Sequence, residues 1–289
     1  METGNNLSKI TGFFLIRIII GALALIGTVA FTELIIYPAT RLANAGPLLS
    51  SIITDTLNSL SALFVYILIY RLLEKRKINE LNGGDFPKFA IAGFILGLTI
   101  QSLFILVIYA YGGYRIIDVN PFYFILHSLA TALMAGFVAE LLIRGVFFRI
   151  IEEKLGTVLT LFIAVIFFSL AHMNKEGATW LSIAATTTEA GFMLSAAFVY
   201  SRSLWLPIFL HFAWDFVEPG IFGAINPGNS IKESLISSEI TGSPLISGGS
   251  LGPQNSIQSL VICAITGIAF LCLAYRKKNF IKPFWAKRA

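Results

Sequence analysis

Two apolar stretches of the sequence each carry a pair of ionisable residues spaced four positions apart. Glu140 and Arg144 lie in FVAELLIRG, and His211 and Asp215 lie in LHFAWDF, while His172 ends a third stretch, FFSLAH. A spacing of four places both members of a pair on one face of a helix. Histidine and carboxylate side chains that converge in a sheltered polar cavity can activate water and stabilise the oxyanion of peptide hydrolysis. The three stretches are therefore candidates for one polar functional site.

Each of these residues also has a structural interpretation. Arg144 and Glu140 can form an ion pair that holds helices together; we prefer this interpretation for Arg144 and leave it open for Glu140. Glu189, in ATTTEAG among three threonines, is interpreted first as a hydrogen-bonded packing residue and second as part of the same cavity. A single histidine at a helix end, such as His172, is more often an interfacial residue than a catalyst. A catalytic interpretation of these residues therefore depends on whether the three stretches converge.

The depth of these residues along their helices supports convergence. If two antiparallel helices meet at Gly156, Glu140 and His172 each lie 16 residues from the turn, which is about 24 Å at 1.5 Å per residue. Asp215 lies 13 residues beyond an expected turn at Arg202, or about 20 Å from it. We therefore expect the three helices to direct these side chains into one polar pocket.

These helices belong to a chain that is too apolar for a soluble protein. Of its 289 residues, 56% are hydrophobic and 13% are charged, whereas soluble domains carry about 25% charged residues. The apolar runs are continuous, which disfavours a β-barrel, and they approach the ~20 residues needed to cross a bilayer. We expect an all-α, polytopic membrane helix bundle of about eight transmembrane helices, forming one membrane domain over residues 1–289. The apolar segments are 11–37, 48–71, 88–111, 121–153, 157–173, 178–200, 203–218 and 257–275.

Basic residues indicate how the bundle is oriented. They concentrate in the turns after the second, fourth and sixth segments and in the tail 276–289. The positive-inside rule then places both termini in the cytoplasm of a multi-pass cell-membrane protein. The Gly-, Ser- and Pro-rich segment 219–256 is expected to be an external loop. Because orientation explains the net charge of +5, no nucleic-acid partner is expected. Cys263 and Cys272 lie in an apolar run and are expected to be inert.

The three stretches resemble the motifs of the CPBP family, the CAAX proteases and bacteriocin-processing proteins, which includes the type II CAAX prenyl endopeptidases. The family pattern is Glu-Glu-x-x-x-Arg, then Phe-x-x-x-His, then His-x-x-x-Asn or Asp. Here Arg144 ends the first motif, Phe168 to His172 form the second, and His211 to Asp215 form the third. The stretch SLWLPIFLHFAWDF is especially similar to bacterial members. The resemblance covers about residues 121–276.

The resemblance implies a role for each motif residue. The first glutamate of the family pattern and the second-motif histidine, here His172, are thought to activate water. The third motif, here His211 and Asp215, would stabilise the oxyanion, and the second glutamate, here Glu140, is thought to be less critical. This chain has Ala139 where the first glutamate is expected, and alanine cannot accept a proton.

Two explanations fit Ala139: an introduced Glu-to-Ala change that disables an active enzyme, or a natural loss in a degenerate member. Glu140 points about 100° away around the helix, which argues against Glu140 as a replacement base. Asp215 would donate a hydrogen bond to an oxyanion only when protonated. Alternatively, an ionised Asp215 would orient His211.

We therefore expect an intramembrane endopeptidase that acts on a membrane-associated peptide or protein and is impaired by Ala139. One alternative is a non-catalytic member that serves as a membrane scaffold or a bacteriocin immunity factor. A less favoured alternative is a proton-coupled transporter, which intramembrane acids would suit but which would more often show repeats and broken helices. The motif histidines and carboxylates are possible zinc ligands by type, but without an HExxH motif no metal or other cofactor is expected. The sequence predicts no particular oligomeric state.

Overall fold

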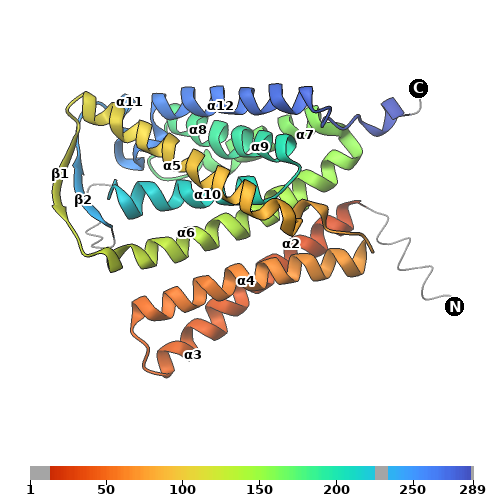
Figure 1. Cartoon of the computed structure of the whole chain (residues 1–289), viewed down its shortest axis with the longest axis horizontal. Coiled ribbons are helices and arrows are strands. Elements are labelled where there is room, and N and C mark those ends of the chain that lie inside the picture. Colours follow the sequence, from red (N-terminus) through yellow and green to blue (C-terminus); the bar gives the residue numbers. More distant parts are fainter. Residues whose placement is uncertain (1–13, 225–233, 288–289) are drawn as a thin grey trace.

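The computed structural model describes residues 14–224 and 234–287 as a bundle of helices with a small sheet at one end (Figure 1). Residues 11–13 of the first predicted segment, 225–233 of the predicted external loop and 288–289 of the predicted tail lie outside the described residues. The expected all-α membrane bundle is confirmed. Its helices are α2 (Phe14–Phe31), α3 (Tyr37–Leu42), α4 (Pro47–Leu73), α5 (Phe86–Ala110), α6 (Ile125–Glu140), α7 (Arg149–His172), α8 (Trp180–Thr186), α9 (Leu194–Ser201), α10 (Trp205–Phe216), α11 (Pro244–Ser247) and α12 (Ile257–Arg276).

Within the described residues, five helical stretches are long and apolar enough to cross a bilayer: Phe14–Leu42, Pro47–Leu73, Asn79–Ala110, Phe122–His172 and Ile257–Arg276. The fourth contains two predicted segments, 121–153 and 157–173, which meet at the non-helical residue Gly156 inside α7; the π-helical turn η5 (Leu141–Phe148) joins α6 to α7 within the first of them. The remaining two predicted segments are found as the shorter helices α8, α9 and α10. The start of α2 and the end of α12 lie at the same end of the bundle (Figure 1). The number of membrane crossings and the side on which the termini lie stay predictions.

The two turns expected at Gly156 and Arg202 are found there. Gly156 has a φ of 77°, and a Cβ atom at this position would lie 2.7 Å from the backbone nitrogen of Pro283 and 2.8 Å from the oxygen of Ile281. Glycine suits both this left-handed conformation and the close approach of the C-terminal segment. Arg202 ends α9 in the left-handed region with a φ of 52°, and its guanidinium binds Glu152 at 2.6 Å. These turns set the depth of the motif residues along α7 and α10.

Helix α10, which carries the third motif, packs against both α5 and α6, and glycines let these helices approach closely. Gly93 and Gly97 form a small-xxx-small pair on α5, and a Cβ atom at Gly97 would lie 2.9 Å from the carbonyl oxygen of Leu210. On α6, a Cβ atom at Gly136 would lie 2.8 Å from the carbonyl oxygen of Ile208. The absence of side chains at these positions therefore determines how near the third motif lies to α6.

Replacing Gly136 with valine is expected to separate α6 from α10 and to destabilise the bundle. The added side chain has no space against the α10 backbone, and overpacking of this kind costs about 1–3 kcal/mol. Thermal unfolding of the purified protein in detergent measures the change. Gly27→Val on α2 is the matched control, because a Cβ atom at Gly27 meets no atom within 4 Å. Equal unfolding midpoints for the two variants would contradict the close contact.

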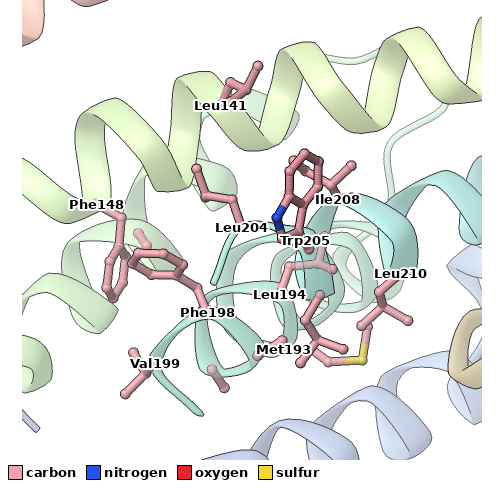
Figure 2. Close-up of a cluster of buried hydrophobic side chains, with 14 of the residues drawn as sticks. Leu141, Phe148, Met193, Leu194, Phe198, Val199, Leu204, Trp205, Ile208 and Leu210 are labelled. Carbon is pink, nitrogen blue, oxygen red and sulfur yellow. The ribbon is translucent and has the colours of Figure 1, made fainter. Parts of the chain in front are cut away.

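An apolar core joins η5, α9 and α10 (Figure 2). Leu141 and Phe148 come from η5, Phe198 comes from α9, Leu204 directly precedes α10, and Ile208 lies in the first turn of α10. All five side chains are almost completely buried, and removing apolar area from water stabilises their packing. Because η5 and α10 also carry residues of the first and third motifs, this core fixes those motifs relative to each other.

The sequence did not predict a small antiparallel sheet, in which β1 (Tyr114–Val119) pairs with β2 (Ile236–Ile240). Tyr114 lies opposite Ile240 in the register, and the Tyr114 hydroxyl donates a hydrogen bond to the carbonyl oxygen of Phe222 at 2.8 Å. Strand β2 and helix α11 both lie in the predicted loop 219–256. The described parts of this segment are therefore folded against the bundle.

Helix α4 ends at the end of the bundle opposite the sheet (Figure 1), and an ionic cluster follows it there. Glu74, which follows α4, binds Arg17 at 2.7 Å, Arg76 at 2.5 Å and Arg149 at 3.0 Å. Burial alone would raise the pKa of Glu74, but hydrogen bonds from the three arginines outweigh burial and lower the pKa below its usual value. Arg76 lies in the basic turn after the second predicted segment. Because it binds both Glu74 and Glu80, it also ties the end of α4 to the residues before α5.

Candidate active site

The first and third motifs meet in the interior of the bundle. The side chain of Glu140 is completely buried; its Oε1 accepts a hydrogen bond from Arg144 Nη1 at 2.8 Å and lies 2.8 Å from His211 Nδ1. On the other side of the ring, His211 Nε2 lies 3.3 Å from Asp215 Oδ2. Four of the predicted site residues therefore form one continuous chain from η5 through α6 to α10, in the order Arg144, Glu140, His211, Asp215.

His211 has a carboxylate oxygen facing each of its ring nitrogens. A neutral imidazole donates a hydrogen bond from one nitrogen, whereas an imidazolium donates from both. The two carboxylates hold the ring in one orientation but differ in exposure: 35% of the Asp215 side chain is exposed, against none of Glu140. Asp215 is also the member of this pair that lines a cavity. Of the two contacts that His211 makes, the one with Asp215 is therefore the more accessible to solvent.

Arg144 connects the first motif to two other elements. Its guanidinium donates a short hydrogen bond to the carbonyl oxygen of Ala190 and lies 5.4 Å above the ring of Phe168. Ala190 belongs to the π-helical turn η6 (Thr187–Met193), and Phe168 is the first residue of the second motif on α7. A buried arginine that is shared among a carboxylate, a carbonyl and an aromatic ring joins elements together. These contacts favour the structural interpretation of Arg144.

A cavity of about 460 Å³ opens beside the contacts between Arg144, Glu140, His211 and Asp215. Asp215 and Glu218 line the cavity from α10 and the π-helical turn η7 (Val217–Ile221), and α6 contributes a stripe of residues at helical spacing: Ser128, Thr131, Ala132 and Ala135. Ala139 continues that stripe one turn further, whereas Glu140 lies about 100° away around the helix. The position that lacks the expected glutamate is therefore on the cavity face of α6.

His172 lies apart from the row of contacts that runs from Arg144 to Asp215. It ends α7, its ring stacks on Phe168 with centroids 6.1 Å apart, and its Nδ1 lies 2.9 Å from the Phe168 carbonyl oxygen. It lines a second cavity of about 160 Å³ together with Lys175 and Thr186. In the described part of the chain, no hydrogen bond or ion pair joins His172 to Glu140, His211 or Asp215. The expected convergence therefore holds for the first and third motifs, and the second motif reaches them through Phe168.

Two buried glutamates complete the charged interior. Glu189 on η6 is buried and has Glu140, Arg144, His211 and Asp215 as electrostatic neighbours, so it belongs to the same cluster. Glu218 was missed from the sequence, although its spacing of three from Asp215 and seven from His211 continues the same helical face. The Pro219–Gly220 pair that follows it is typical of a helix end and concealed this signal.

The motif residues do not make an evident metal centre. Across the described residues, no group of three or more His, Cys, Asp or Glu side chains is arranged to hold a metal ion. Arg144 forms an ion pair with Glu140 at 2.8 Å.

Comparison with known proteins finds a family that the central part of the chain resembles. Residues 121–217 match the family model of type II CAAX prenyl endopeptidases, described as Rce1-like. No curated protein and no solved structure matches the chain. The match begins just before α6 and ends just after α10, so it contains all three motifs and the Arg144–Asp215 chain of contacts. Over residues 121–217, this membrane protein is thus similar to the Rce1-like type II CAAX prenyl endopeptidases, the family that its motifs resemble.

Proposed function

We propose that this chain is a membrane-embedded endopeptidase of the CAAX type that binds a membrane-associated peptide but lacks, at Ala139, the base that activates water. The placement of position 139 carries the proposal. Ala139 continues the α6 face that lines the cavity beside Asp215, whereas Glu140 is taken up by Arg144 and His211. A glutamate at position 139 would face the cavity, and Glu140 does not.

The proposed reaction divides the work between the two sides of the cavity. A glutamate at 139, with His172 as its partner, would accept a proton from water as the water attacks the scissile carbonyl carbon, and the proton would pass to the leaving amine. His211 and Asp215, the latter in its protonated form, would donate hydrogen bonds to the oxyanion that forms. Glu140 and Arg144 would hold His211 in place, and Glu189 would support the same cluster.

The test is hydrolysis of a farnesylated CAAX peptide by the Ala139→Glu protein in liposomes, compared with the chain as it stands. Cleavage by the variant alone is the expected result, because only the variant has a proton acceptor at this position. A folded Ala139→Glu protein that does not cleave the peptide would overturn the proposal.

Asp215→Asn in the Ala139→Glu background is expected to retain cleavage within about tenfold, because the asparagine amide keeps a hydrogen-bond donor at the cavity. Asp215→Ala removes the donor and is expected to lower kcat by about 10²–10³. Initial rates at saturating peptide measure both effects. If Asp215→Asn abolishes cleavage as completely as Asp215→Ala, the role of Asp215 is to orient His211 as an ionised carboxylate.

A second candidate function is favoured by Ala139 itself. A family member without the base can still bind a peptide in the cavity, and so could serve as a membrane scaffold or as a bacteriocin immunity factor. This function predicts peptide binding by the chain as it stands and no cleavage by Ala139→Glu, which separates it from the enzyme.

A further inference from the structure

Residues 249–255, which we call the inner segment, separate the two cavities of the site. Leu251 and Gln254 line the cavity that contains Asp215 and also the cavity that contains His172. Three further residues of the segment are buried: Gly252, Pro253 and Asn255. A stretch predicted from composition as part of an external loop is therefore inserted between the third motif and the second.

The inner segment contacts the elements of the third motif through Gln254. The backbone N–H of Gln254 donates a hydrogen bond to Glu218 Oε2 at 3.1 Å, and its side-chain Oε1 accepts one from Trp214 Nε1 at 3.0 Å. Trp214 and Glu218 flank Asp215 on α10 and η7. One donor and one acceptor beside a catalytic motif match what an extended peptide offers, namely one carbonyl oxygen and one N–H per residue.

We propose that Trp214 and Glu218 form a peptide-backbone subsite, which the inner segment occupies in place of the substrate and leaves when a substrate peptide binds. This inference rests on the proposed function, because its ligand is the peptide that the enzyme would cleave. Since Leu251 and Gln254 wall both cavities, their departure joins the two cavities and opens a path between Asp215 and His172. The presence of the inner segment between the cavities explains why the second-motif histidine lies apart from the third motif in this structure.

The conformation of the inner segment suits such a movement. It consists of two single turns, Gly249–Leu251 and Pro253–Asn255, joined at Gly252 with a φ of 85°. Apart from the Gln254 contacts, its side chains reach the preceding helices through Asn255 Oδ1, which accepts a hydrogen bond from Thr186 Oγ1 at 3.2 Å. Glycines on both sides of Leu251 provide backbone freedom for displacement.

Binding of a fluorescent farnesylated CAAX peptide to the chain as it stands, in nanodiscs, tests the proposal without any need for cleavage. Gln254→Ala removes the amide oxygen that accepts a hydrogen bond from Trp214 Nε1 at 3.0 Å, and we expect binding to tighten by about threefold to tenfold, the effect of one lost competing hydrogen bond. Gly252→Ala is a second route to the same result, because its Cβ atom would lie 2.9 Å from Glu218 Oε1 and the residue has a positive φ. Gln258→Ala on α12 is the matched control. The side-chain amide of Gln258 donates a hydrogen bond to the carbonyl oxygen of Ile246 at 2.6 Å, and its loss should leave peptide affinity unchanged.

Hydrogen exchange provides an independent measurement. Peptide binding should speed amide exchange over residues 249–255, because the segment leaves its buried position. Slower exchange on binding, equal affinity of Gln254→Ala and Gln258→Ala, or no binding by any variant would each overturn the proposal. Cleavage by Ala139→Glu without a Gln254 effect would overturn this inference alone. Gln254-dependent binding without cleavage by Ala139→Glu would overturn the proposed enzyme alone.

Discussion

Ala139→Glu is expected to raise the rate of hydrolysis of a farnesylated CAAX peptide by about 10²–10⁴-fold over the chain as it stands, the usual contribution of a positioned general base. The reason is placement: position 139 continues the α6 stripe of Ala132 and Ala135 that lines the cavity beside Asp215. A carboxylate there can reach water in the cavity. Initial rates in proteoliposomes, measured by mass spectrometry of the released tripeptide, give the ratio.

Two variants decide whether the gain comes from proton transfer. Ala139→Gln adds a side chain of the same size that cannot act as a base, so it should stay at the background rate. Ala135→Glu places a carboxylate on the same stripe but one helical turn away, about 6 Å along the axis, and should also stay inactive. Equal activity of Ala139→Gln and Ala139→Glu would mean that bulk at position 139, and not a base, restores the site.

Local periodicity made the chain of contacts from Arg144 to Asp215 predictable. A spacing of four put each pair on one face, and turns at Gly156 and Arg202 set the depth of both helices, so that Glu140 and His211 meet at 2.8 Å. Both turns have backbone conformations that few residues adopt, with φ values of 77° and 52°, and the lengths of the apolar runs already located them. Features encoded within one helix or one turn were thus accessible from the sequence.

Contacts between distant segments were not accessible in the same way. Strands β1 and β2 are six and five residues long and lie more than a hundred residues apart, so neither has a local signal strong enough to predict pairing. Gln254 contacts Trp214 and Glu218 across 40 and 36 residues, from a stretch whose Gly and Pro content predicts an exposed loop. Helix depth alone could not reveal that Leu251 and Gln254 lie between the cavity of Asp215 and that of His172.

Glu140→Gln is expected to destabilise the protein by about 3–5 kcal/mol, because it leaves the charge of Arg144 buried without its carboxylate. The Glu140 side chain is completely buried and that of Arg144 is 1% exposed, so water cannot replace the lost partner. The same change removes the negative charge that faces His211 Nδ1. Unfolding of the purified variant by heat and by denaturing detergent measures the loss.

Glu153→Gln is the matched control for this effect. Glu153 is paired with Arg149 at the same spacing of four and at 2.9 Å, but 39% of its side chain is exposed, so its loss should cost less than about 1 kcal/mol. If Glu140→Gln is as stable as Glu153→Gln in the Ala139→Glu background and yet abolishes cleavage, Glu140 acts in the reaction itself. If it unfolds and the double change Glu140→Leu with Arg144→Met restores stability, as replacement of a buried ion pair by apolar residues often does, the pair is structural. Glu140 would then serve the reaction by holding His211 beside the cavity that position 139 faces.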